Sequence, residues 1–253
     1  MVNNVENFDR LIRIYLLFFV LTTGSYEIIA QETLPEPDII EVRSKYQATL
    51  NNIETKRQEF YSAYKIATSA QSQAEIIESI QDYLSESLEQ NIFPAWYGTV
   101  WDYNGMSAVP GEGKIACGYF ITRILSQLGF KIKYIQLAQQ TSRNMIRNLV
   151  PKVDIIYSFN NEAVNSVKEK IKQLGKGIYI AGLDCHVGFI IYDGDEFYRF
   201  VHASYYSPPL CVVSETLDTD NPFAHSQYRV IGKLFSRELI EQWLKGEDIP
   251  VKY

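Results

Sequence analysis

The chain has few cysteines and histidines, since its 253 residues include only three of each. These residues are scattered and lack the spacing of zinc ligands, so we expect no bound metal. The chain also lacks a phosphate-binding loop and a dinucleotide fingerprint, and we expect no other cofactor. Positive charge is scarce as well: a net charge of −6 argues against a general nucleic-acid binder, which would show a basic face.

Internal repeats, low-complexity tracts and runs of like charge are also missing. What remains is 46% hydrophobic and 21% charged, which is the composition of a globular protein. A chain of this length can hold one catalytic domain of ordinary size with additional helices.

Residues 1–30 have the order of a secretory signal peptide. Arg10 and Arg13 precede an apolar run over residues 14–21, and small residues lead to Ala30, after which we expect cleavage. The run is well short of the roughly 20 residues of a membrane-spanning helix. We therefore expect a secreted or periplasmic protein with no stable membrane insertion after cleavage. An uncleaved anchor or an interfacial helix is the alternative.

The remaining chain divides into a linker over residues 31–39, a helical accessory region over residues 40–91 and a catalytic domain over residues 92–253. Apolar residues at helical spacing predict two helices in the accessory region, with a break near residues 69–72 and an end at Pro94. In the catalytic domain we expect helices from Cys117 and over residues 141–149, 164–174 and 237–245, and strands over residues 131–137, 153–159, 177–183, 186–192, 196–202 and 228–235. A helix followed by antiparallel strands is an α+β layout.

Cys117 stands where an apolar helix begins, because the residues that follow it at helical spacing form one apolar face: Phe120, Ile121, Ile124, Leu125 and Leu128. A helix N-terminus and a nearby imidazolium both stabilise a thiolate. The sequence therefore predicts Cys117 as a nucleophile with a lowered pKa.

His186 and His202 stand at the two ends of a predicted β-hairpin with a turn at residues 193–195. A three-residue loop would place the two histidines opposite each other with both side chains on one face, whereas a two-residue loop would point them to opposite faces. The first register makes a triad in which His186 is the general base and His202 orients its ring.

Residues 186–194, which read His-Val-Gly-Phe-Ile-Ile-Tyr-Asp-Gly, together with residues 200–204, which read Phe-Val-His-Ala-Ser, resemble the histidine hairpin of the NlpC/P60 cysteine peptidases. Residues 101–105 are similar to the family's Tyr-Gly-Gly approach to its nucleophile. The resemblance covers residues 96–207 and implies a papain-like fold. It also implies that Tyr103 lies beside the thiol and helps to bind substrate or the oxyanion, and that Trp101 and Asn104 help to bind substrate. The family usually has Asp-Cys-Ser-Gly at the nucleophile, whereas this chain has Ala-Cys-Gly-Tyr at residues 116–119.

The resemblance implies a cysteine hydrolase that cleaves amide bonds in peptides of the bacterial cell wall, the peptidoglycan. Two rivals stay open. A transglutaminase-like acyl transferase also places cysteine at a helix start, although its third residue is normally an aspartate where this chain has His202. A catalytically idle papain-like domain would bind cell-wall peptides without cleaving them. In an oxidising compartment, Cys185 and Cys211 either form a disulfide or are small buried hydrophobes.

Overall fold

The computed structural model describes residues 39–252, which belong to one compact unit. The predicted signal peptide and all but the last residue of the predicted linker lie outside these residues. Among the described helices, none is both long and apolar enough to cross a membrane.

The N-terminal part of the described chain is helical, as the sequence predicts. Helix α2 (Ile39–Ile66) is followed by α3 (Ala70–Glu86), the π-helix η1 (Ser87–Ile92) and the short α4 (Phe93–Trp96). The break between α2 and α3 falls where it is expected. Ser69 caps α3 and forms a capping box with Ser72, which satisfies N–H groups that the helix leaves free. Pro94 does not end the helical region, because α4 follows directly on the π-helix η1 and continues through Pro94 to Trp96.

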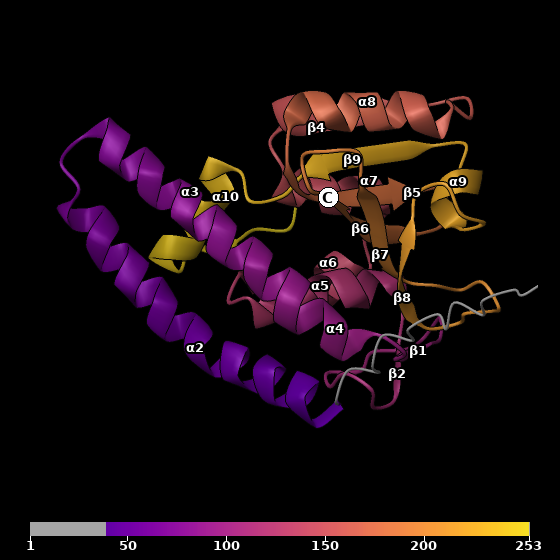
Figure 1. Ribbon diagram of the computed structural model, residues 1–253, viewed down its shortest axis with the longest axis horizontal. Coiled ribbons are helices and arrows are strands. Elements are labelled where there is room, and N and C mark those ends of the chain that lie inside the picture. Colours follow the sequence, from indigo (N-terminus) through magenta and orange to yellow (C-terminus); the bar gives the residue numbers. More distant parts are fainter. Residues whose placement is uncertain (1–38, 253) are drawn as a thin grey trace, which may run out of the picture. The chain divides into compact units, whose positions relative to one another are not determined.

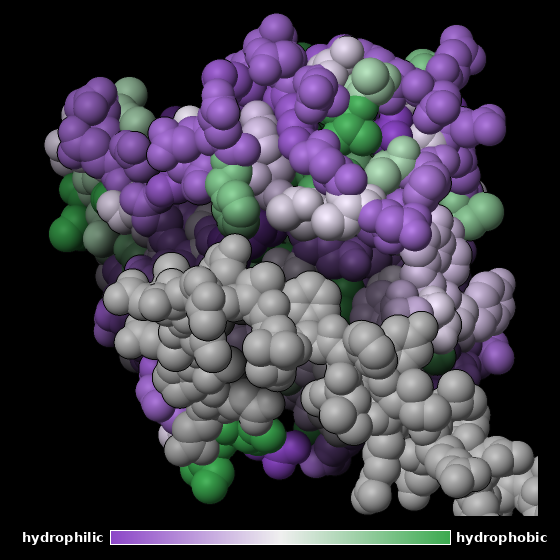
Figure 2. Space-filling model, turned by 45° about the vertical axis from the view of Figure 1, so that its right-hand side comes forward, coloured by the Kyte–Doolittle hydropathy of each residue, from purple (hydrophilic) through white to green (hydrophobic). Residues whose placement is uncertain are grey.

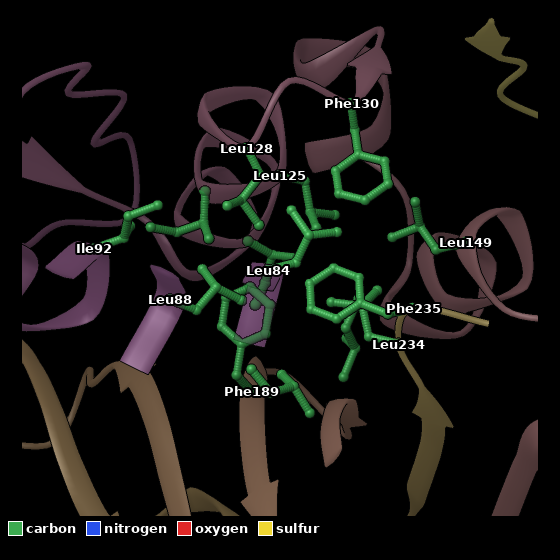
Figure 3. Packing of buried hydrophobic residues seen from close by; sticks show 14 of the residues in the cluster. Leu84, Leu88, Ile92, Leu125, Leu128, Phe130, Leu149, Phe189, Leu234 and Phe235 are labelled. Atoms are coloured by element: carbon green, nitrogen blue, oxygen red, sulfur yellow. The ribbon is translucent and has the colours of Figure 1, made fainter. Parts of the chain in front are cut away.

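These helices share one of the two hydrophobic clusters with later parts of the described chain. Leu84 of α3 and Leu88 of η1 are fully buried against Leu125, Leu128 and Phe189 (Figure 3). No boundary between two separate cores therefore falls near residue 92 in the described chain. The helices α2 and α3 lie side by side in Figure 1 and also contact α10 (Arg237–Lys245) near the end of the chain.

The remaining elements follow in the order of an α+β protein. They are β1 (Val100–Trp101), β2 (Lys114–Ile115), α5 (Cys117–Gln127), β3 (Lys131–Ile132), α6 (Tyr134–Ala138), α7 (Ser142–Leu149), η2 (Lys152–Asp154), β4 (Ile155–Ser158), α8 (Val164–Leu174), β5 (Gly177–Leu183), β6 (Val187–Tyr192), β7 (Tyr198–Ala203), β8 (Val212–Thr216), α9 (Pro222–His225), β9 (Arg229–Lys233), α10 and β10 (Asp248–Ile249).

The centre of the fold is a six-stranded antiparallel sheet with the strand order β4-β9-β5-β6-β7-β8. Its two faces are covered by different elements (Figure 1). Val187, Phe189 and Val201 point to the face that packs on α5, and Ile190 and Phe200 point to the face that packs on α8 and α9. Because both faces are buried, β6 is apolar throughout rather than alternating.

The predicted α+β class and most predicted elements are confirmed, with two corrections. Residues 131–137 form only the two-residue strand β3, and Tyr134–Ala138 is helix α6 rather than strand. Alternating apolar residues over so short a stretch fit a helical turn as well as a strand. Strand β8 is not predicted at all, because Pro208 and Pro209 stand just before it and Ser214, Glu215 and Thr216 give it a polar texture.

One face of the molecule is mostly polar at its surface. On the face shown in Figure 2, most of the surface coloured by hydropathy is hydrophilic, with hydrophobic residues scattered among charged ones. Single exposed hydrophobic residues are normal for a globular protein. Most of the apolar residues that recur at helical spacing are buried in the interior.

Candidate active site

Cys117 is the first residue of α5, as the sequence predicts. Ala116 precedes it in an extended conformation, and no side chain caps the helix. The first N–H groups of any α-helix lack partners within the helix, so those of Cys117 and Gly118 are free to meet a negative charge. Gly118 is required here for a separate reason: a Cβ at this position would lie 2.5 Å from the carbonyl oxygen of Ala138 in α6. This contact explains why glycine follows the cysteine.

The thiol of Cys117 meets the beginning of β6. Burial raises its pKa, and backbone hydrogen bonds from Val187, Gly118 and Cys117 itself oppose this rise without cancelling it. The predicted lowering of the Cys117 pKa is therefore wrong for the free protein. The sequence argument counted the helix terminus and an imidazolium, but it did not count the loss of water around a thiol that is nearly enclosed. The bond from Val187 places the sulfur beside the backbone of the residue that follows His186.

The two histidines come together on the hairpin, although in a different register from the predicted one. Tyr192 pairs with Tyr198 and Phe189 with Val201, so the loop spans residues 193–197 rather than three residues. This register differs from the predicted one by two positions. A shift of two keeps every side chain on its face, and so His186 and His202 still share one. They are diagonal neighbours across β6 and β7, not direct partners.

Gly188 makes room for this diagonal contact. A Cβ on Gly188 would lie 2.4 Å from the ring of Phe200 and 2.8 Å from the Cβ of His202. The imidazole of His202 stacks on Phe200 with ring centroids 4.2 Å apart. Packing therefore requires a glycine at position 188, because any larger residue would displace the rings of Phe200 and His202.

A line of hydrogen bonds connects three side chains from three adjacent strands. The Nε2 of His186 lies 2.9 Å from the Nδ1 of His202, and the Nε2 of His202 lies 2.9 Å from the Oε2 of Glu215. His202 is 0% exposed and His186 is 3% exposed, whereas the side chain of Glu215 on β8 is 22% exposed. The remaining nitrogen, Nδ1 of His186, is buried and has no hydrogen-bond partner among residues 39–252.

Burial dominates the ionisation of both imidazoles. It lowers the pKa of His186 well below its usual value, and the neighbouring His202 lowers it further. Burial also lowers the pKa of His202, although the hydrogen bond and the charge of Glu215 act in the opposite direction. With a raised thiol pKa and lowered imidazole pKa values, the thiol and both rings are neutral at rest. The rings lie on the sheet face of Phe200, which packs on α8 and α9, whereas α5 packs on the other face, so the thiol approaches His186 through the backbone N–H of Val187 at the start of β6.

Tyr205 lies against His186. Their rings are 5.2 Å apart between centroids, and the thiol of Cys117 contributes to the raised pKa of Tyr205 after burial, Tyr206 and Cys185. Trp101 approaches the site through Tyr205, at 6.1 Å between ring centroids. Tyr103 is 80% exposed.

Asn104 belongs to the same exposed turn as Tyr103. Its backbone N–H donates to the carboxylate of Asp102, which is the hydrogen bond of an Asx turn. A role of Tyr103 or Asn104 in substrate binding stays a prediction, since neither residue lies against the imidazoles in the contacts described above.

A small pocket opens beside His186. It has a volume of about 130 Å³ and is lined by Cys185, Tyr205, Tyr206, Pro222 and His225, among others. Pockets for whole small molecules are usually at least twice as large, so this one fits a single side chain. The carboxylate of Asp184 also lines it, but this group already accepts hydrogen bonds from Ser226, Gln227 and Tyr228.

The other cysteines are not paired. Cys117, Cys185 and Cys211 are all free thiols, and Cys185 is exposed. The disulfide between Cys185 and Cys211 is therefore absent from the structure, and Cys185 is not the buried small hydrophobe of the alternative. Among residues 39–252, no group of three His, Cys, Asp or Glu side chains is arranged to hold a metal ion.

No protein-family model, curated protein or solved structure matches the chain. The assignment of the site accordingly depends on its own geometry.

One residue of the site, Glu215, was not predicted from the sequence. It lies on β8, a strand that the sequence analysis did not recognise. The Val-Val pair at residues 212 and 213, directly after a proline turn, is the signal that would have indicated the strand. An acidic residue in a strand beside two histidines would then have been a candidate.

Proposed function

We propose that the protein is a cysteine hydrolase that cleaves amide bonds, with Cys117 as nucleophile, His186 as general base and His202 as the residue that orients His186. The observation that carries this proposal is the buried Nδ1 of His186. It is the free end of a hydrogen-bonded line of side chains, and it belongs to the residue next to the N–H group that contacts the thiol. A buried polar atom without a partner is costly in free energy, and a catalytic role is one of the reasons for which such an atom is retained.

The reaction follows from the neutral state of the pair. His186 takes the thiol proton at Nδ1 as the sulfur attacks the amide carbon, so that no stable thiolate is needed beforehand. The free N–H groups at the start of α5 stabilise the oxyanion. The amine leaves with the proton from His186, and a thioester to Cys117 remains. Water then attacks this thioester, gives one proton to His186, and releases the carboxylic acid and the thiol.

The substrate class is proposed from the resemblance to NlpC/P60 peptidases and from the pocket. A peptide of the cell wall would place its carbonyl beside Cys117 and one side chain in the pocket next to Tyr206 and His225. A papain-like arrangement of helix and sheet, and secretion by a signal peptide, belong to the same proposal. The antiparallel sheet with α5 on one face supports the fold part.

A catalytically idle domain is the second candidate, and one observation favours it. Burial raises the pKa of Cys117 and lowers that of His186, which an inert buried pair would also show. The two candidates differ in whether His186 assists the chemistry of the thiol.

The test measures alkylation of each cysteine by iodoacetamide in the parent and in His186→Gln, with the labelled peptides quantified by mass spectrometry. A hydrolase predicts that His186→Gln slows labelling of Cys117 and leaves Cys211 unchanged. In parallel, peptidoglycan fragments are incubated with the parent and with Cys117→Ala, and the products are weighed. Cleavage that survives Cys117→Ala would contradict the proposal. Intact fragments together with labelling independent of His186 would establish the idle domain.

A further inference from the structure

Glu215 stands at the end of the line of imidazoles, and its position is set by the sheet. His202 pairs with Val213 across β7 and β8, and Phe200 pairs with Glu215. Side chains of paired residues point to the same face, so Glu215 is the diagonal neighbour of His202 on the face of both histidines. The repeated diagonal geometry places His186, His202 and Glu215 in a row across β6, β7 and β8.

The carboxylate of Glu215 at one end of the row fixes which nitrogen of each imidazole donates and which accepts a hydrogen bond. An ionised carboxylate can only accept hydrogen bonds, so the Nε2 of His202 must carry its proton. A neutral imidazole has only one N–H, and the Nδ1 of His202 is therefore an acceptor. The Nε2 of His186 must then donate to it, at 2.9 Å, and the Nδ1 of His186 is left with a lone pair. A donor in place of Glu215 would allow the reverse order and would put a proton on that Nδ1.

We infer that Glu215 is a positioning residue, whose carboxylate sets the tautomer of His202 and, through it, leaves the Nδ1 of His186 free to accept a proton. The inference rests on the proposed function for the meaning of that lone pair, whereas the tautomers themselves can be measured without any substrate. Glu215 acts only through the two rings.

Few other titratable groups of the described chain lie close enough to the row to fix the tautomers of its two imidazoles. Within residues 39–252, the titratable groups in ring or electrostatic contact with the row are Tyr205 at the His186 end and the thiol of Cys211 near Glu215. The pKa of Cys211 is raised, first by burial and also by the charge of Glu215, which keeps this thiol neutral. Glu215 is thus the group in direct hydrogen bond with His202 that has a fixed acceptor role.

The experiment uses the full chain labelled with ¹⁵N-histidine, because ring ¹⁵N shifts distinguish the two tautomers. With only three histidines in the chain, His225→Gln assigns the third signal set. In the parent at pH 7.5, we expect His186 and His202 both protonated at Nε2 and bare at Nδ1. A parent spectrum with a proton on the Nδ1 of either ring overturns the inference without any variant.

Glu215→Gln is the matched test, since the amide has nearly the same size but offers both a donor and an acceptor. We expect the preference for the Nε2 tautomer of His202 to be lost. The control is Glu89→Gln, because Glu89 is a half-buried carboxylate that pairs with Arg199 on the same strand β7 and does not touch the imidazoles. Unchanged ring shifts in Glu215→Gln would show that the carboxylate is only structural and would overturn the inference.

Alkylation by iodoacetamide links the tautomer to the thiol. We expect Glu215→Gln to slow labelling of Cys117 on the order of tenfold, and Glu89→Gln to leave it unchanged. If the ring shifts change in Glu215→Gln while labelling of Cys117 responds neither to this variant nor to His186→Gln, the positioning role is correct and the proposed hydrolase is wrong. If labelling of Cys117 requires His186 but the ring tautomers do not change in Glu215→Gln, the proposed hydrolase stands and the inference about Glu215 fails.

Discussion

The Nε2 of His186 lies 2.9 Å from the Nδ1 of His202, although the two residues are diagonal neighbours and not a cross-strand pair. The diagonal places one ring edge-on to the other, at 84° between planes, so that a nitrogen of each ring meets the other in line. Stacked rings would have turned these nitrogens away. The offset register of the hairpin therefore creates the hydrogen bond on which the candidate site depends.

The first prediction separates the roles of the two histidines. His186→Ala removes the base, and we expect turnover of any peptide that the protein cleaves to fall by about two to four orders of magnitude. His202→Gln should cost less, because an amide oxygen can still accept from the Nε2 of His186. The comparison is made on the same peptidoglycan fragments by product mass. His202→Ala with the activity of the parent would mean that another group orients His186.

The second prediction concerns stability against pH. Because the folded pKa of His186 and of His202 is lowered, the unfolded chain binds more protons than the folded one below the ordinary histidine pKa of about 6.5. The free energy of unfolding is then constant above this pH. It decreases as the pH falls, by about 1 kcal/mol per pH unit for each ring, until the folded pKa is reached.

Urea unfolding between pH 8 and pH 5 measures this dependence. The double variant His186→Gln with His202→Gln should lose most of the slope, and His225→Gln should keep it, since His225 is exposed and pairs with Asp220. A parent that grows more stable toward pH 5 would contradict the neutral state of the buried rings.

The third prediction concerns Gly188. Gly188→Ala places a methyl group against the ring of Phe200 and the Cβ of His202, at 2.4 and 2.8 Å. We expect the free energy of unfolding to drop by about 1–3 kcal/mol and the bond between the imidazoles to be displaced. Gly98→Ala is the control, because it strains the backbone at a φ of 78° but meets no atom within 4 Å. Ring ¹⁵N shifts should change in the first variant only; equal shifts in both would contradict the packing argument.

The fourth prediction concerns the N-terminal helices. From the sequence alone we expect a chain that begins near Ile92 to be less stable, yet to keep the reactivity of Cys117 wherever it folds. The structure adds that this truncation also removes Leu84 and Leu88 from the core around Leu125 and Phe189. A milder change therefore gives the cleaner test.

Leu84→Ala should lower the free energy of unfolding by about 2–5 kcal/mol, because it leaves a cavity at a fully buried position. Ser79→Ala, on the exposed side of the same helix, serves as the control for stability. If folded Leu84→Ala protein has a Cys117 that no longer reacts with iodoacetamide at the rate of the parent, the helices help to build the site and are more than an accessory.

The sequence by itself determined the elements whose signals are local. The helix from Cys117, the cap at Ser236 before α10 and the helix α8 that ends before Gly175 all follow from periodicity, capping residues and turn residues. Each depends on neighbours within a few positions along the chain.

Only the tertiary structure decided the features that depend on distant segments. The two-position shift of the hairpin reflects packing of Phe200 and His202 over Gly188, and Glu215 reaches His202 because β8 closes the edge of the sheet. Tyr205 lies against His186, and burial raises the pKa of Cys117 that the helix terminus was expected to lower. Desolvation and cross-strand contacts come from residues far apart in sequence, so no local pattern around Cys117 or His202 carries them.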